Sequence, residues 1–147
     1  MEEQNNLTEI TIYTDGACSG NPGKGGWGAI LMYKNHKKPI SGFEEHTTNN
    51  RMEMMAVIKS LEMLTKSCVV NLFTDSKYVA NGITEWLSKW KKNNWKNSSK
   101  KPVENQDLWK RLDELLQQHQ VKVNWVKGHA EDDLNNEVDM LARSAIL

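Results

Sequence analysis

Three segments near the amino terminus alternate apolar and polar positions in the way that half-buried β-strands do. They cover residues 7–14 (LTEITIYT), 27–33 (WGAILMY) and 39–46. Turn-forming residues separate them, so they predict an antiparallel meander. A fourth segment, residues 68–74 (CVVNLFT), is a short apolar run typical of a central strand, and it leads directly into Asp75.

Helical periodicity follows the meander. Asn50 is typical of a helix N-cap, with Glu53 three residues later as in a capping box. The next apolar positions recur at helical spacing and are expected to face the core: Met54, Val57, Ile58, Leu61 and Leu64. Helical pieces are also expected within residues 78–92, and a leucine-rich amphipathic helix starts near Asp107.

Two further elements complete the pattern. A last strand is predicted at residues 121–126 and a closing helix at residues 135–146. The order β-β-β-α-β-α-β-α predicts a single α/β domain over residues 1–147. Its five-stranded mixed sheet would have three antiparallel strands followed by two parallel ones, with helices flanking the sheet.

Composition supports a globular domain. The chain has 147 residues, of which 38% are hydrophobic and 26% charged, which is enough apolar material for a sizeable core. Residues 1–6 are polar and expected to be loosely ordered, without the character of a signal peptide. No apolar run approaches the ~18 residues of a membrane span. With only Cys18 and Cys68, no disulfide framework is predicted, and a cytoplasmic protein is expected.

A formal net charge of zero hides two oppositely charged segments. Residues 86–101 (WLSKWKKNNWKNSSKK) hold six lysines, three tryptophans and no acid, whereas residues 130–139 hold five acids. Because each segment has its own local potential, each can have its own partner.

A glycine-rich stretch at residues 23–28 matches the dinucleotide-binding pattern G-x-G-x-x-G. That pattern needs a helix after the glycines, whose N-terminus meets the pyrophosphate, and here a β-patterned segment follows. The pattern of a nucleoside-triphosphate loop fails as well. The glycines are therefore interpreted as part of an Asn-Pro-Gly turn with positive φ angles, and as a surface that another molecule's backbone can approach.

Four acids stand out at Asp15, Glu53, Asp75 and Asp139. Taken singly, each fits a turn, a capping box or a solvated helix face. However, Asp15 and Asp75 each follow a β-patterned run, so adjacent parallel strands would place them side by side. Carboxylates brought together repel one another unless a cation neutralises them, and Mg²⁺ prefers oxygen ligands. Two such ions are suited to phosphodiester chemistry.

Five motifs in register resemble bacterial ribonuclease H of type 1, over about residues 8–146. They are YTDGACSGNPGKGGWG, TTNNRMEMMA, FTDSKYV, KKPVENQDLW, and WVKGHA followed ten residues after its histidine by Asp139. The resemblance implies a ribonuclease H-like fold. It also implies an endonuclease that hydrolyses the RNA strand of RNA–DNA hybrids by two-metal-ion cleavage, leaving 5′-phosphate and 3′-hydroxyl ends.

The family's functional residues fall on definite positions of this chain. The metal-binding acids fall on Asp15, Glu53, Asp75 and Asp139, with two Mg²⁺ ions in the substrate complex and Mn²⁺ able to substitute. Glu53 would also sense the RNA 2′-hydroxyl. A histidine thought to help proton transfer or product release falls on His129.

Substrate contacts are implied in three places. The minor groove of the hybrid would be read by backbone groups near Cys18 and by Asn21, Asn49 and Asn50. Thr48 would touch a DNA phosphate, and Asn135 matches a family asparagine near the active site. Lys77 stands beside Asp75 where a glutamine is frequent, and would add a phosphate contact. A basic protrusion at residues 86–104 would hold the DNA strand through Trp86, Lys91, Lys92 and Lys96, whereas Trp90 and Trp109 are expected in the core.

The chain also departs from the family pattern. Asn94 stands where many relatives have a glycine hinge, and asparagine also tolerates left-handed backbone. Glu104 replaces a common lysine, and residues 131–133 make the loop after His129 more acidic.

Two rival interpretations stay open: a hybrid-binding module without catalysis, and a DNA-cutting resolvase or transposase subunit of the same broad architecture. The four acids speak against the first, and the 2′-hydroxyl-facing asparagines with the basic protrusion speak against the second. A monomer is expected, with an RNA–DNA hybrid as partner, no membrane association and no organic cofactor.

Overall fold

The architecture is known from a computed structural model that describes residues 7–127 and 133–147. A five-stranded sheet in the order β3-β2-β1-β4-β5 forms its centre. Its strands are β1 (Thr8–Ser19), β2 (Gly23–Tyr33), β3 (His36–Thr47), β4 (Cys68–Thr74) and β5 (Gln120–Trp125). The first three pair antiparallel, and β4 pairs parallel with both β1 and β5. The predicted mixed sheet is confirmed.

The first strand is longer than predicted, so Asp15 does not end it. β1 and β4 pair in parallel only as far as Thr14 and Thr74. Beyond that point β1 continues beside β2 alone, and its last pair joins Ser19 to Lys24. Asp15 therefore lies inside β1, one residue beyond its last pair with β4, where the chain after β4 leaves the sheet.

The helices surround this sheet. They are α1 (Asn49–Glu62), α2 (Lys77–Asn81), α3 (Leu87–Lys92), α4 (Gln106–Gln118) and α5 (Asp133–Ser144), with a π-helical turn at Gly82–Trp86 joining α2 to α3. The cap of α1 is Thr48, not Asn50 as predicted, because the Thr48 hydroxyl accepts from the backbone N–H of Arg51 at 3.2 Å.

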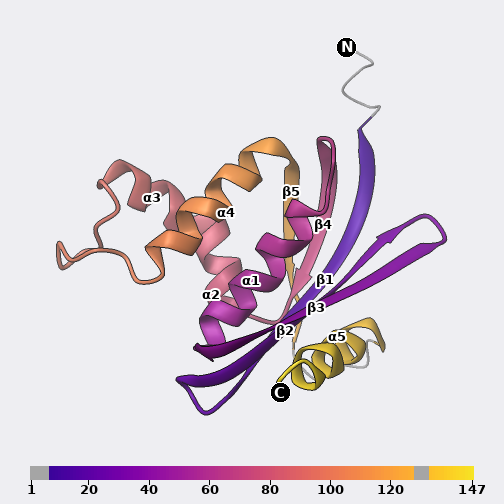
Figure 1. Cartoon of the computed structure of the whole chain (residues 1–147). Coiled ribbons are helices and arrows are strands. Elements are labelled where there is room, and N and C mark those ends of the chain that lie inside the picture. The colour runs from indigo at the N-terminus through magenta and orange to yellow at the C-terminus, as the bar shows by residue number, and fades with distance from the viewer. Residues whose placement is uncertain (1–6, 128–132) are drawn as a thin grey trace.

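The two faces of the sheet carry different helices (Figure 1). On one face, Ile12 and Leu72 of the sheet pack in one cluster with Val57 of α1 and Leu112 of α4. On the other face, β-strand residues pack against Val138 of α5. No helix in the described residues is both long enough and apolar enough to cross a membrane.

Most of the predicted glycine loop is strand. The turn between β1 and β2 spans only residues 20–22, and among the described glycines only Gly20 has a positive φ, at 81°. Gly26 and Gly28 face α5 instead. A methyl group at Gly26 would collide with the carbonyl oxygen of Ala142, and one at Gly28 would lie 2.6 Å from a side chain of α5. At these two positions the space predicted for another molecule is filled by the protein's own helix.

Candidate active site

Three carboxylates meet at the edge where β1 and β4 separate. Asp15 of β1, Glu53 of α1 and Asp75 directly after β4 each offer an oxygen, and these oxygens all lie within 4.8 Å of one another. The parallel register brings the two aspartates together, because each follows the last β1–β4 pair. Glu53 reaches them because α1 crosses β1 at Gly16, where an added methyl group would collide with the backbone nitrogen of Glu53.

These acids line a small polar cavity of about 200 Å³. Its wall also contains Gly16, Asn49, Asn135, Asn136 and Asp139. Asp139 comes from α5, on the opposite face of the sheet from α1. Its Oδ2 accepts from Nε and Nη2 of Arg143, one helical turn away, at 3.0 and 2.9 Å. We call the four acids and this cavity the acid pocket.

Burial and mutual repulsion disturb the ionisation of the acid pocket. Asp15 is 5% exposed, and its pKa is raised to about 8, first by burial and then by the charge of Asp75 and a hydrogen bond with Asp139. The backbone N–H of Gly16 opposes this shift by donating to Asp15 at 2.9 Å. The pKa of Glu53 is raised well above its ordinary value by burial, then by Asp15 and Asp75.

The donor set fits a hard divalent cation. Oε1 of Glu53 is buried and has no hydrogen-bond partner within residues 7–127 and 133–147. An unpartnered buried carboxylate oxygen is unfavourable in a protein interior unless something satisfies it. A cation that takes oxygen ligands would satisfy it and would remove the repulsion that raises the pKa values of Asp15 and Glu53.

The polar residues expected to contact the substrate gather beside the acid pocket. The Cys18 thiol donates to the carbonyl oxygen of Thr47 at 3.5 Å, and the side chain of Asn21 accepts from the backbone N–H of Asn49 at 3.1 Å. These contacts hold the β1–β2 turn against the start of α1. Thr48 caps that helix, and Asn50 is exposed in its first turn. Their contact with a substrate stays a prediction.

Asn135 joins the acid pocket from α5. It is 4% exposed and lines the cavity beside the acids, as expected for a residue near the reaction. His129 and residues 131–132 lie outside the described residues, so the predicted histidine has no structural account here.

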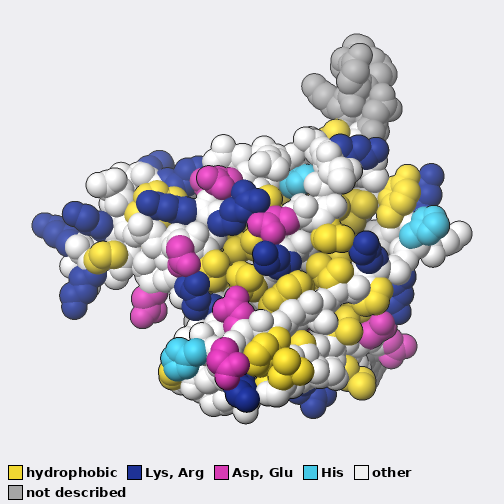
Figure 2. Space-filling view, in the orientation of Figure 1, with side chains coloured by type: hydrophobic (Ala, Val, Ile, Leu, Met, Phe, Trp, Pro, Cys, Tyr) yellow, Lys and Arg dark blue, Asp and Glu magenta, His cyan; other side chains and the backbone are white. Residues whose placement is uncertain are grey.

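The basic protrusion, residues 86–104, forms a separate surface. All six of its lysines are exposed, and Figure 2 shows Lys and Arg side chains gathered at the end of the molecule where Figure 1 places α3. Trp86 and Lys96 line one cavity of about 430 Å³. Lys92 is exposed, whereas Nζ of Lys91 pairs with Asp113 of α4 at 3.2 Å. The predicted DNA-binding residues are therefore not equivalent.

An aromatic cluster supports the base of the protrusion. Trp109 is fully buried, which confirms its assignment to the core. Trp90 packs against that core with its ring 5.4 Å from the Trp109 ring, and the Trp86 ring lies 5.7 Å further out. Asn94 has a φ of 56°, so it adopts the left-handed backbone that its place at a glycine hinge predicts.

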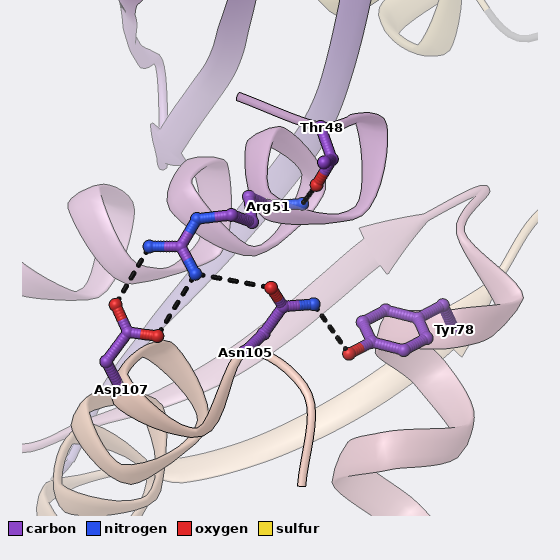
Figure 3. A network of polar contacts seen from close by, with 5 residues as sticks. All are labelled: Thr48, Arg51, Tyr78, Asn105 and Asp107. Atoms are coloured by element: carbon purple, nitrogen blue, oxygen red, sulfur yellow. Dashed lines mark hydrogen bonds and ion pairs between the residues drawn. The ribbon is translucent and has the colours of Figure 1, made fainter. Parts of the chain in front are cut away.

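A polar network joins the start of α4, which directly follows the protrusion, to the helix that carries Glu53 (Figure 3). Arg51 of α1 donates twice to the carboxylate of Asp107, at 3.0 and 2.8 Å, and once to Asn105 at 3.2 Å. Asn105 donates in turn to the hydroxyl of Tyr78 at 3.0 Å. The network thus ties α1, α2 and the start of α4 together, and sequence reasoning did not find it.

Trp125 is a second residue that sequence reasoning missed. It is the last residue of β5, it is 45% exposed, and its indole N–H donates to the backbone carbonyl of Asp75 at 3.0 Å. Nζ of Lys77 lies 5.1 Å from the centre of its ring. The motif WVKGHA contains this tryptophan, but nothing in the motif itself places the ring beside an acid.

Comparison with known proteins agrees with this geometry. The family model of RNase H matches residues 7–147. A ribonuclease H of Thermoanaerobacter sp. (strain X514) is 61% identical over 145 residues, which cover 97% of this chain and 92% of that protein. The solved structure of LC9-RNase H1, a type 1 RNase H with the type 2 active-site motif, is 30% identical. It matches with a TM-score of 0.86 over 95% of this chain and 72% of its own.

A second solved structure is the foamy viral protease-reverse transcriptase in complex with RNA/DNA hybrid. It is 25% identical and matches with a TM-score of 0.79 over 95% of this chain and 20% of its own. The family model and the 61% identical relative each span nearly the whole chain. The chain therefore belongs to the ribonuclease H family and is a hydrolytic endoribonuclease.

Proposed function

We propose that this enzyme hydrolyses the RNA strand of RNA–DNA hybrids and leaves 5′-phosphate and 3′-hydroxyl ends. The observation that carries the proposal is the convergence of Asp15, Glu53 and Asp75 within 4.8 Å, beside short polar groups at the start of α1. Membership in the ribonuclease H family supports it, and so does the likeness to a viral enzyme solved with an RNA/DNA hybrid.

The acid pocket would hold two divalent cations, Mg²⁺ or Mn²⁺ in its place. Asp15, Glu53 and Asp75 would hold the first, and Asp139 would complete the second site. Bound cations of this kind supply charge stabilisation for the attacking and leaving oxygens of a phosphodiester. The acids would fix where the scissile phosphate lies, because Asp15 stands on β1, Glu53 on α1 and Asp75 directly after β4.

The polar cluster beside the acid pocket would distinguish RNA from DNA. Only RNA carries a 2′-hydroxyl, which both donates and accepts, and short amide and hydroxyl groups can read it from a wide minor groove. Asn21 and Asn49 already hold each other in place, so they meet the groove as a preformed pair. Glu53 would meet the 2′-hydroxyl next to the scissile phosphate.

The basic protrusion would hold the DNA strand. Exposed lysines attract phosphates without regard to sequence, and the Trp86 face offers a surface on which sugars or bases can stack. Lys77 would contact a phosphate near the acids, and His129 would assist proton transfer or product release. We expect the enzyme to act as a monomer in the cytoplasm and to need no organic cofactor.

The test is cleavage of labelled RNA–DNA, RNA–RNA and DNA–DNA duplexes side by side with added Mg²⁺ or Mn²⁺, with analysis of the product ends. We expect cleavage of RNA in the hybrid alone, with 5′-phosphate ends. Equal cleavage of the DNA duplex would favour a DNA nuclease. Hybrid binding without any cleavage would favour a binding module.

A further inference from the structure

Trp125 lies at a junction that the acids and the proposed substrate share. Its strand is the neighbour of β4, and the two strands end together with the pair Thr74–Trp125. The backbone N–H of the next residue, Val126, donates to the Thr74 carbonyl at 2.9 Å. The Trp125 indole N–H donates to the following carbonyl, that of Asp75, at 3.0 Å. Two consecutive carbonyls at the end of β4 are thus held by this edge of β5.

The face of the same ring holds a cation. Lys77 is the first residue of α2, two positions after Asp75, and its Nζ lies 5.1 Å from the Trp125 ring centre. This distance is within the range of a cation–π contact. Within the described residues Lys77 makes no ion pair, although Asp75 lies only two positions before it. The ammonium therefore lies against the ring, and no carboxylate of residues 7–127 or 133–147 pairs with it.

We infer that Trp125 is a positioning residue with two separate contacts, one for catalysis and one for substrate binding. Its N–H fixes the backbone of Asp75, and through it the Asp75 carboxylate. Its ring face holds the Lys77 ammonium beside the acid pocket, where the ammonium contacts a backbone phosphate of the bound hybrid. The inference deepens the proposed function and rests on it.

The two contacts can be removed one at a time. Trp125→Phe keeps an aromatic face but loses the N–H, so we expect kcat to fall while hybrid affinity stays near that of the wild type. Lys77→Gln removes the charge, so we expect a several-fold loss of hybrid affinity and a salt slope smaller by about one. Lys77→Arg is the matched control, because it keeps the charge and the cation–π contact, and its slope should match the wild type.

A double-mutant cycle tests whether the ring positions the lysine. Trp125→Leu removes both contacts, and Trp125 is exposed enough for this change to leave the core intact. If the ring holds the ammonium, Lys77→Gln will have much less effect on hybrid affinity in the Trp125→Leu background than in the wild type. Binding is measured with a chelator, so that no cleavage occurs, and thermal unfolding checks that each variant is folded.

Three results would overturn the inference. They are additive losses in the cycle, an unchanged salt slope in Lys77→Gln, and an unchanged kcat in Trp125→Phe. If Trp125→Leu does not fold, the Gln and Arg variants at position 77 still decide the phosphate contact, and Trp125→Phe still decides the N–H contact. If the wild type binds the hybrid but never cuts it, the proposed function fails by itself. If the wild type cuts the hybrid and the cycle is additive, only this inference fails.

Discussion

In the acid pocket the carboxylates arrive from elements that are far apart in the sequence, whereas in the basic protrusion the lysines follow one another along a single stretch of chain. Asp15, Glu53 and Asp75 depend on the β1–β4 register and on the crossing of α1 over β1. The protrusion is shaped by local contacts, such as the isolated bridge between Lys96 and Pro102. One surface is placed by the whole fold, and the other by its own segment together with the neighbouring helix α4.

The two surfaces also differ in what they do to stability. Buried like charges destabilise the folded state, as the raised pKa values of Asp15 and Glu53 record. Exposed lysines are hydrated and screened by salt, so they are nearly neutral for folding. The acids that would carry out the chemistry therefore oppose folding and depend on exact placement, whereas the exposed lysines that would supply affinity have little effect on folding.

The largest expected effect is on cleavage. Asp15→Asn keeps the shape of the side chain but removes one charge from the acid pocket. Losing a residue that only hydrogen-bonds to a metal ligand costs up to about a hundredfold in activity. Because Asp15 would be a ligand itself, we expect hybrid cleavage to fall by more than that. Hybrid binding should remain measurable, because the basic protrusion is untouched. A gel assay with end-labelled RNA measures the first, and fluorescence anisotropy the second. Retained turnover would contradict the assignment of Asp15.

The next effect is on stability and its pH dependence without metal. The pKa of Asp15 is raised from 3.8 to about 8, so the folded protein keeps a proton that the unfolded chain releases. Its contribution to stability is present below pH ~4 and is lost as the pH rises toward 8, by at most about 1.4 kcal/mol per pH unit. Asp15→Asn should lack this loss and be the more stable protein at pH 8.

Urea unfolding of both proteins at pH 4.5, 6 and 8 in a chelator measures this difference. Added Mg²⁺ should stabilise the wild type more than the variant, because a cation bound to the folded state alone stabilises it. A wild-type stability that rises relative to the variant between pH 4.5 and 8 would contradict the raised pKa of Asp15.

A smaller effect is expected in the basic protrusion. Replacing Lys91, Lys92 and Lys96 with Ala should weaken hybrid binding and reduce its salt slope by about one for each lysine that contacts a phosphate. Because Lys91 already pairs with Asp113, we expect a reduction nearer two than three. The single variant Lys91→Ala is the control and should change the slope least. An unchanged slope in the triple variant would mean that these lysines are only a solvated face.

The smallest effect concerns the network that joins α1, which carries Glu53, to the start of α4 directly after the basic protrusion. Arg51→Met removes the cation that pairs with Asp107 and Asn105, and partly exposed pairs of this kind contribute up to about 1 kcal/mol. The pKa of Asp107, now lowered mainly by its hydrogen bond to Arg51, should return toward its ordinary value. Urea unfolding and NMR titration measure the two changes. A decrease of several kcal/mol in the free energy of unfolding would contradict this small contribution.

The sequence predicted most of the fold because apolar patterns reflect burial directly. Residues 68–74 form β4 with the predicted bounds. The predicted N-cap of α1 was wrong because both Thr48 and Asn50 are good capping residues. Only the hydrogen bond from the backbone N–H of Arg51 to the Thr48 hydroxyl distinguishes them. The extension of β1 beyond Asp15 was missed because it depends on pairing with β2, which lies outside any local pattern.

The candidate site was predictable to a different degree in each part. Asp15 and Asp75 could be placed together because each directly follows the last pair between two neighbouring parallel strands. Trp125 was missed because the hydrogen bond from its side chain to the Asp75 carbonyl depends on the position of the ring in three dimensions. The ion pair of Lys91 was missed for the same reason, since Asp113 lies on the next helix. Sequence patterns indicate which residues carry the chemistry, but not which of their side chains already bind other groups of the protein.

Gly28 offers a way to adjust this enzyme. It pairs with Asp15 across the β1–β2 ladder, and its bare face touches α5, the helix that carries Asp139. An added methyl group there would push α5, and with it Asp139, away from the other three acids without altering any functional side chain. A substitution at Gly28 would therefore change the distance between Asp139 and the other three acids while keeping all four of them.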